Sequence, residues 1–440
     1  MTFGRRVFLT ALGTAVGLPA HAQRPTNPDV AIIGAGVAGL AAARALMAAG
    51  KSVLVIEARE RIGGRALTEQ ATLGFPFDHG AQWIEAGKSN PAMAILRDMN
   101  AKPLADRERQ RIFLAGNELN KDNYARLEKI SAAAAHKIAE VLKLLPDVPV
   151  GKLLVPQDRL ERLAYAMVGP LEAGVENIDL SARDFTRQPD TDPQYAVAEG
   201  LGALIARWGA KVPVKLGTRA VRIDSTGSEI AIETTAGQVR AKACIVTVPT
   251  GVLATGLLGF APQLTAAKKE AIAQLPMASY NKVAILFTRQ VIDAAPGTNV
   301  TALTKAEHAF DAVVRPANRE AAICFLGGAH GKQLEEQGSG PAVAFAVSAL
   351  ADIYGNDLRG ALARSFTTRW GLDPFARGAW SAARPGHADK RAVLARPHHD
   401  RVFFAGEATD PVWAARVGGA YASGLRAAQE ALTVPALQRR

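Results

Sequence analysis

Cysteine is scarce in this chain, with only Cys244 and Cys324 among 440 residues. Both lie in apolar stretches, ACIVTV and AAICFLGG, that have the composition of buried strands. A disulfide would require the two strands to face one another with about 5 to 6 Å between Cα atoms. We therefore expect two inert core thiols. The sequence also lacks any Cys and His cluster with the spacing of metal ligands, so no metal is expected.

Acidic residues are outnumbered, 41 Asp and Glu against 52 Lys and Arg, which gives a net charge of +11. Such a charge attracts anions in general. The basic residues are dispersed, however, and aromatic residues, only 6% of the chain, do not alternate with them in a stripe. This pattern predicts a basic soluble protein and no nucleic-acid partner.

Internal repeats and low-complexity blocks are absent too, so the chain reads as an ordinary globular protein. It is 48% hydrophobic and 21% charged over 440 residues. That length and composition are enough to bury a large core and favour two intertwined domains over one.

The N-terminal stretch, residues 1–22, is MTFGRRVFLTALGTAVGLPAHA. Its apolar part, residues 7–18, is too short and too glycine-rich to span a bilayer as a stable helix. The arginine pair Arg5 and Arg6, with a small-residue cleavage site at Ala20-His21-Ala22, resembles a bacterial twin-arginine export signal. That resemblance implies a periplasmic or secreted protein that meets the export machinery already folded, with any non-covalent cofactor loaded. An ordinary Sec signal or an uncleaved anchor is the alternative.

Residues 29–65 carry a dinucleotide-binding pattern. An apolar strand, residues 29–33, precedes Gly34, Gly36 and Gly39; an Ala-rich helix runs to about residue 49, and a second strand ends at Glu57. The glycines provide a tight turn, close approach of the backbone to a pyrophosphate and close helix-to-strand packing. Glu57 follows Gly39 by 18 residues, as expected of an acid that binds a ribose hydroxyl, and it disfavours NADP.

Further motifs resemble those of the flavin-containing amine oxidase family. They are EARERIGGR at residues 57–65, GAQW at 80–83 and AGEAT at 405–409, in the family's order and spread over nearly the whole chain after residue 22. The resemblance implies extended, non-covalently bound FAD, because Ala379 stands where members with covalent flavin have cysteine. The implied cofactor-binding residues are Gly34, Gly36, Gly39, Glu57, Arg59, Gly63, Gly64, Arg65, Gly80, Ala81, Gln82, Trp83, Val221, Trp370, Gly406, Glu407 and Val417.

The same resemblance implies an α/β fold in which a Rossmann-type FAD-binding domain is interleaved with an α+β substrate domain. We assign residues 29–90, 195–265 and 390–435 to the FAD domain, and 91–194 and 266–389 to the substrate domain. Glu407, at the end of the strand RVFFAGE, is expected to bind the ribityl chain and to be stabilised by the helix N-terminus at Gly418. A salt-bridged or helix-capping glutamate is the alternative.

Lys282 and Trp380 are the residues expected at the reacting face of the flavin. Lys282 begins the apolar run NKVAILF and resembles the family lysine that holds a water beside flavin N5; burial would lower its pKa. Trp380, in RGAWSAARPG, resembles one wall of the family's aromatic cage. A surface lysine at a strand edge and a tryptophan buried in the core are the structural alternatives.

Arg416 departs from the family pattern, because many members have an aromatic wall at this position. A permanent cation there would repel a protonated amine. Glu85, in HGAQWIEAG, resembles the glutamate that recruits the cationic substrate in plant-type polyamine oxidases. Glu85 is therefore expected either to bind a distal ammonium or to form an ion pair with Arg416. Arg416 facing solvent, or gripping a substrate carboxylate, are the other possibilities.

The sequence thus predicts FAD-dependent oxidation of an amine to an imine with hydrogen peroxide formation, the substrate being a polyamine or a primary monoamine. The alternatives are an L-amino-acid oxidase that uses Arg416, a dehydrogenase that passes electrons to a cytochrome, and an exported protein with a structural FAD. The acceptor is oxygen or another redox partner, and the oligomeric state is left open.

Overall fold

The protein is described by a computed structural model over residues 27–105 and 109–438. The export signal expected at residues 1–22 lies outside these residues. None of the helices within them combines the length and the apolarity that crossing a bilayer requires.

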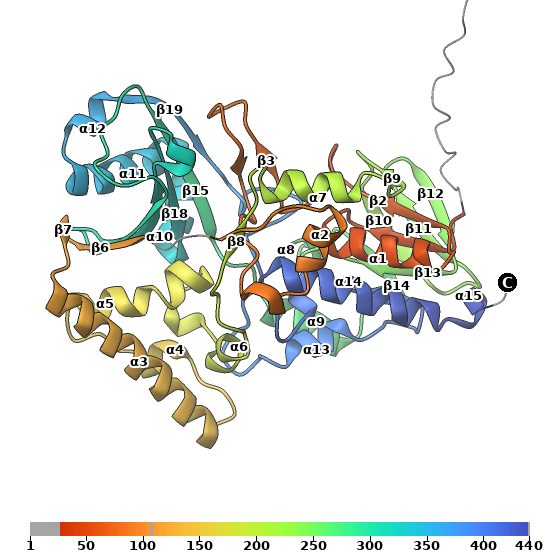
Figure 1. Ribbon diagram of the computed structural model, residues 1–440. Coiled ribbons are helices and arrows are strands. Elements are labelled where there is room, and N and C mark those ends of the chain that lie inside the picture. Colours follow the sequence, from red (N-terminus) through yellow and green to blue (C-terminus); the bar gives the residue numbers. More distant parts are fainter. Residues whose placement is uncertain (1–26, 106–108, 439–440) are drawn as a thin grey trace, which may run out of the picture.

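A five-stranded parallel sheet forms the half of the molecule at the right of Figure 1, in the order β20-β13-β1-β2-β9. Strands β1, β2 and β13 are buried at every position, as is usual for parallel strands covered on both faces. The strands are β1 (Val30–Ile33), β2 (Val53–Ile56), β9 (Val214–Lys215), β13 (Ala243–Val246) and β20 (Val402–Phe404).

One face of this sheet is covered by α1 (Val37–Ala48) and α14 (Val417–Leu432), which lie side by side although they come from opposite ends of the chain. Alanine and glycine at the contact allow the two helices to approach closely: a Cβ on Gly424 would stand 2.2 Å from the carbonyl oxygen of Ala38. Helix α7 (Leu201–Gly209) adds its apolar side to the same core.

A second, four-stranded sheet in the order β12-β11-β10-β14 contributes to the core on the other face. Its strands are β10 (Ala220–Asp224), β11 (Ile230–Thr234), β12 (Gly237–Ala241) and β14 (Gly259–Ala261). Helices α9 (Ala266–Gln274) and α13 (Lys390–Ala395) pack on each other, and α9 buries Ala271 and Ile272 in this core.

The other half of the molecule is built on a seven-stranded sheet in the order β19-β15-β18-β17-β16-β6-β7. All but one of its strand pairs are antiparallel; β6 and β16 run parallel. Its strands are β6 (Gln110–Leu114), β7 (Asn117–Glu118), β15 (Tyr280–Phe287), β16 (Thr298–Leu303), β17 (Ala309–Val314), β18 (Ala321–Gly327) and β19 (Leu362–Thr367).

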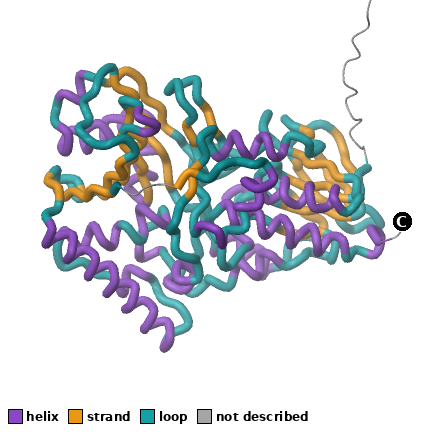
Figure 2. Tube along the Cα trace, in the orientation of Figure 1, coloured by secondary structure: helices purple, strands orange, loops and turns teal. Residues whose placement is uncertain are grey.

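Helices cover this second sheet from two sides, and Figure 2 shows its strands set apart from those of the parallel sheet. Helices α10 (Gly328–Gln337) and α11 (Ser339–Tyr354) pack against the sheet, and α3 (Lys121–Leu144) packs on α5 (Arg159–Ala166). A π-helical turn, η2 (Gly169–Ala173), contacts β17 and β18. The remaining short elements are α2 (Met93–Asp98), α4 (Val150–Leu153), α6 (Ala182–Thr186), α8 (Thr250–Leu253), α12 (Asp357–Gly360), α15 (Pro435–Gln438), β3 (Thr68–Glu69), β4 (Phe77–Asp78), β5 (Leu104–Ala105) and β8 (Tyr195–Ala196).

Segments 29–90, 195–265 and 390–435 supply every strand of the parallel sheet, and the intervening segments supply every strand of the seven-stranded sheet. Packing crosses these boundaries in several places. Ile95 and Leu96 of α2, in segment 91–194, lie in the core of the parallel sheet. Helix α9, at residues 266–274, shares the core beside the parallel sheet. Leu73, Phe75 and Phe77 pack on β18 of the seven-stranded sheet. Apolar side chains at the segment ends bury against whichever sheet is adjacent.

We predict that Gly424→Ala lowers the free energy of unfolding by about 1–3 kcal/mol, because the added methyl group overpacks the contact between α1 and α14. The matched control is Gly340→Ala in α11, where a Cβ meets no atom within 4 Å. Because Gly340 is the second residue of the helix and makes no such contact, that change should alter the free energy of unfolding by less than about 0.5 kcal/mol. Denaturant titration of both variants checks the prediction, and equal stabilities would contradict it.

Candidate active site

A cavity of about 630 Å³ lies between the parallel sheet and the seven-stranded sheet. Its lining residues at one end include Gly34, Gly36 and Glu57, from the turn after β1 and the end of β2. At the opposite end they include Asn299, Thr301 and Asp311, from β16 and β17. A ligand that fills the cavity therefore contacts both halves of the molecule.

The glycine turn after β1 fits a dinucleotide. Gly34 has a φ of +103°, and a Cβ on Gly39 would stand 2.0 Å from the carbonyl oxygen of Gly34, so side chains are excluded at both positions. Gly36 is the N-cap of α1, and a Cβ there would meet nothing within 4 Å. No side chain caps the first turn of α1 within the described structure. The free N–H groups at this end suit a phosphate.

Glu57 borders the same end of the cavity and holds the glycine turn. Its Oε2 accepts a hydrogen bond from the Ala35 N–H at 2.7 Å, and its Oε1 accepts one from the Arg59 N–H at 2.8 Å. A carboxylate has about four acceptor sites, so two are left for ribose hydroxyls. The guanidinium of Arg59 forms a bidentate pair with Asp373, at 2.8 Å for each bond, which already neutralises its charge.

Glu407 lies directly after β20, 5% exposed, and receives four hydrogen bonds from the protein. Its Oε1 accepts from Arg65 Nη1 at 2.9 Å and from the Ser381 N–H at 3.1 Å. Its Oε2 accepts from Ser381 Oγ at 2.6 Å and from the Ala415 N–H at 3.0 Å. These bonds satisfy the carboxylate fully and tie three distant segments together at the cavity wall.

Lys282 is 4% exposed in β15, with its Nζ at the cavity. The three protons of the ammonium go to the carbonyl oxygens of Asp78 at 2.7 Å and Gly80 at 2.9 Å, and to Gln82 Oε1 at 2.8 Å. Burial lowers the pKa of Lys282 to about 8. A water held by Lys282 must therefore replace one of these acceptors, of which only the Gln82 amide is free to rotate away.

Aromatic side chains line the middle of the cavity. Trp380 donates its indole N–H to the carbonyl oxygen of Ala173 at 2.9 Å and lies 4.9 Å from the ring of Tyr280, centroid to centroid. Trp370 donates to the carbonyl oxygen of His79 at 3.0 Å. Trp83 packs on Phe325 with centroids 5.7 Å apart. All of these rings border the cavity, so they give this part of it an apolar, aromatic lining.

Arg416 is the N-cap residue of α14, and its side chain is 7% exposed. The guanidinium forms an ion pair with Glu85 and lies 3.4 Å from both Glu172 Oε1 and Gln188 Oε1. Of the alternatives for Glu85, the structure therefore shows the ion pair with Arg416. Burial raises the pKa of Glu85, and the charge of Arg416 opposes this shift.

Two further carboxyl groups border the cavity near this pair. Glu172, in η2, has its pKa raised to about 7 by burial and by the charge of Glu85, against the opposing charge of Arg416. Asp311, in β17, has its pKa raised to about 6 by burial, and its Oδ1 has no partner among the described residues. Glu85, Glu172 and Asp311 thus lie near one another in the cavity lining, and Arg416 contacts the first two of them.

Comparison with known proteins identifies the family. The sequence pattern of "Flavin containing amine oxidoreductase" matches residues 171–432, and that of an "NAD(P)-binding Rossmann-like domain" matches residues 32–99. The first match spans more than half of the chain. The protein belongs to the flavin-containing amine oxidoreductase family. It is an enzyme that binds FAD and oxidises amines.

This amine oxidoreductase is similar to "Polyamine oxidase 2" of Arabidopsis thaliana, with 27% identity over 93% of this chain and 89% of that protein. It is 29% identical to "Lysine-specific histone demethylase 1 homolog 1" of Oryza sativa subsp. japonica over 91% of this chain and 52% of that protein. A solved putrescine oxidase bound to putrescine shares its fold, with a TM-score of 0.78, 18% identity, and coverage of 92% of this chain and 98% of the other.

Nearly every cofactor-binding residue expected from the sequence borders the cavity, Val417 included. Gly39 does not, since it serves the packing of α1. Val221 does not either: the chain leaves the cavity wall after Ala220, where β10 begins to pair with β11, and Arg219 and Ala220 border the cavity instead. For Glu407, Ala415 is the N–H donor that Gly418 was expected to be. Both cysteines are buried and outside the cavity lining, which excludes thioether attachment of the flavin.

The sequence analysis missed Tyr280, Glu172 and Asp311. Tyr280 could have been found, because it lies two residues before Lys282 in one strand, and residues i and i+2 share a face. Asp311 interrupts an otherwise apolar strand, AFDAVV, which is a weak signal. Glu172 lies in a short turn without a periodic pattern, so no local signal marks it.

We predict that Glu57→Gln lowers the affinity for FAD roughly 10- to 100-fold, since a hydrogen bond to a charged group contributes about 1.5–3 kcal/mol. Titration of the FAD-free protein with FAD measures this. Glu60→Gln, three residues away at an exposed side chain, is the control and should bind FAD as the parent does. Equal FAD affinities of the two variants would rule out the ribose contact.

Proposed function

We propose that this enzyme oxidises a diamine or polyamine, or a primary monoamine, to the imine and hydrogen peroxide. When bound, FAD takes up the hydride removed from the carbon beside the nitrogen. The chain's own residues orient that carbon between the aromatic rings and exclude water from the chamber. The observation that carries the preference for a diamine or polyamine is the excess of carboxyl groups around Arg416 at the substrate end of the cavity.

The excess of negative charge suits a second ammonium group. Arg416 pairs most closely with Glu85 and reaches Glu172 at 3.4 Å, so these two acids share one cation and Asp311 has none among the described residues. An ammonium donates up to three hydrogen bonds, and Asp311 offers an oxygen without a partner. The names of the similar proteins, polyamine oxidase and putrescine oxidase, agree with this choice.

An amino-acid substrate is supported less well. A carboxylate that approached Arg416 would displace Glu85 and would meet the charges of Glu172 and Asp311. Like charges in a buried chamber repel one another strongly. We therefore rank the amino-acid oxidase below the amine oxidase.

Oxygen is the acceptor we propose, with Lys282 assisting its reaction at the flavin. We propose a periplasmic or secreted location, because Arg5, Arg6 and the small-residue site at residues 20–22 support export through the twin-arginine route. A chain exported in this way is folded and carries its cofactor on leaving the cytoplasm.

The experiment that tests the function is anaerobic reduction of the bound flavin by spermidine, putrescine, an aromatic monoamine and several L-amino acids. We expect putrescine or spermidine to bleach the flavin fastest. Bleaching by amino acids alone would reverse the ranking of the two enzyme functions. No bleaching by any compound would leave FAD in a structural role.

The same assay predicts a pH dependence. A carboxyl group with a raised pKa is neutral below that pKa, so Glu172 and Asp311 lose their charge as the pH falls from 8 to 5. The dissociation constant of putrescine should rise over this range by more than that of a monoamine. Asp311→Asn should weaken putrescine binding at pH 8 roughly 10- to 100-fold, and an unchanged constant would exclude this residue from the site.

Lys282→Met should slow reoxidation of the reduced flavin by oxygen about 10-fold or more, because a cation beside the flavin stabilises developing negative charge. FAD should still bind, since the partners of Lys282 are protein oxygens. Stopped-flow mixing of the reduced enzyme with oxygen measures the rate. Lys269→Met, at an exposed lysine, is the control, and equal reoxidation rates for the two variants would remove Lys282 from this role.

A further inference from the structure

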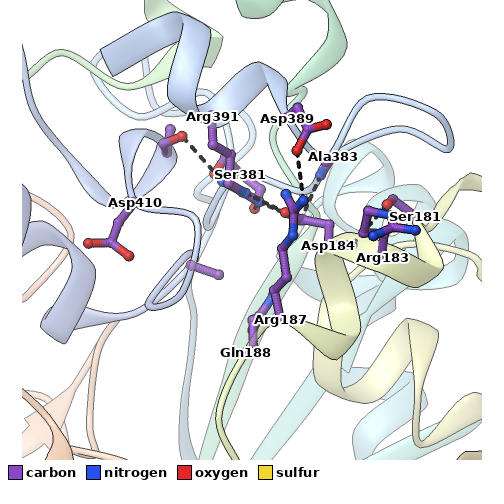
Figure 3. A network of polar contacts seen from close by, with 12 residues as sticks. Ser181, Arg183, Asp184, Arg187, Gln188, Ser381, Ala383, Asp389, Arg391 and Asp410 are labelled. Carbon is purple, nitrogen blue, oxygen red and sulfur yellow. Dashed lines mark hydrogen bonds and ion pairs between the residues drawn. The ribbon is translucent and has the colours of Figure 1, made fainter. Parts of the chain in front are cut away.

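Arg391 is fully buried in α13, 0% exposed, and lies outside the cavity lining. Its Nε and Nη2 form a bidentate pair with Asp184 in α6, at 2.6 and 2.7 Å. Nη1 and Nη2 also donate to Ser381 Oγ at 2.7 Å and to the Ser381 carbonyl oxygen at 3.1 Å, and Nη1 reaches the Ala408 carbonyl oxygen at 3.4 Å. All five guanidinium protons thus have acceptors. Figure 3 shows Arg391 with Asp184 and Ser381 as its partners.

The contact with Ser381 extends toward the cavity. Because Ser381 Oγ accepts from Arg391, its single proton is directed to Glu407 Oε2 at 2.6 Å. The Ser381 N–H donates to the other oxygen of Glu407 at 3.1 Å. Ser381 directly follows Trp380, so these bonds fix the backbone that carries one wall of the substrate chamber.

Glu407 also fixes the backbone just before Arg416, on another wall of the cavity. Its Oε2 also accepts from the Ala415 N–H, and Ala415 has a φ of +64°, a left-handed conformation that alanine seldom adopts. Arg416 follows directly. Ser381 holds the Glu407 carboxylate in place, and this carboxylate in turn stabilises the left-handed conformation of Ala415. That conformation directs Arg416 toward Glu85 and Glu172.

We propose that Arg391 is a positioning residue for amine oxidation, which acts through Ser381 and Glu407 to fix Trp380 and Arg416 at the same time. Arg391 touches neither cavity nor substrate. A displacement of about 1 Å at reacting groups can reduce a rate 100-fold. A residue that does not touch the substrate can therefore control the rate if it holds the residues that do. The proposal rests on amine oxidation itself and not on the preference for polyamines, so the two can fail independently.

The test compares Arg391→Met, Arg391→Lys and Ser381→Ala as FAD-loaded full-length proteins. We expect the rate of anaerobic flavin reduction by saturating amine, per bound FAD, to fall about 10-fold or more in Arg391→Met and in Ser381→Ala. Arg391→Lys keeps the charge and should recover part of the loss. The FAD dissociation constant, measured on FAD-free protein, should change less than threefold for Arg391→Lys, because Arg391 does not border the cavity.

A matched control separates positioning from stability. Lys268 is a buried cation that holds the other end of α13, donating to the carbonyl oxygens of Leu394 and Arg396 at 2.8 and 2.6 Å. Lys268→Met should lower the thermal midpoint yet leave the reduction rate per bound FAD within about twofold of the parent. If Arg391→Met fails to fold, Ser381→Ala and Arg391→Lys still decide. Parental rates in both, or an equal rate loss in Lys268→Met, would overturn the proposal.

Discussion

A carboxylate taken out of water must be matched by hydrogen-bond donors, and at Glu407 this requirement organises the whole site. The donors come from Arg65, after the glycine turn, from Ser381, beside the aromatic wall, and from Ala415, before the last long helix. These segments lie far apart in the chain. Satisfying one buried group therefore brings the cofactor end and the substrate end of the cavity into a fixed relation.

Local electrostatics at the substrate end run against the net charge of the molecule. The chain carries +11 overall, whereas Glu85, Glu172 and Asp311 outnumber Arg416 around the chamber. A field that repels cations at long range makes binding depend on these few buried groups. Burial raises the pKa of Glu172 and Asp311 toward neutral pH. The charge of the chamber therefore depends on the pH and on whether a cationic substrate is bound.

The sequence predicted most accurately the parts of the site that are local in the chain. The glycine turn, Glu57 and the loop to Arg65 follow one another, so spacing alone locates them. Partners from distant segments left less signal: nothing in the sequence around Glu407 shows that Ser381 supplies half of its donors, and the ion pair of Glu85 with Arg416 was one of two alternatives between which only the fold decides. Arg391 lies in a short helix of ordinary composition, and only the fold reveals its connection to the site.

Strand β20 and helix α14 are the last major elements of the chain, yet they flank β13 and α1 at its beginning and middle. A ribosome that has produced the glycine turn has therefore not yet produced the strand, the glutamate and the helix that complete the cavity around it. FAD can be enclosed only after β20 and α14 have been synthesised. A premature stop near residue 400 would leave the glycine turn and Glu57 in the chain but remove Glu407, Arg416 and Val417 from the cavity wall.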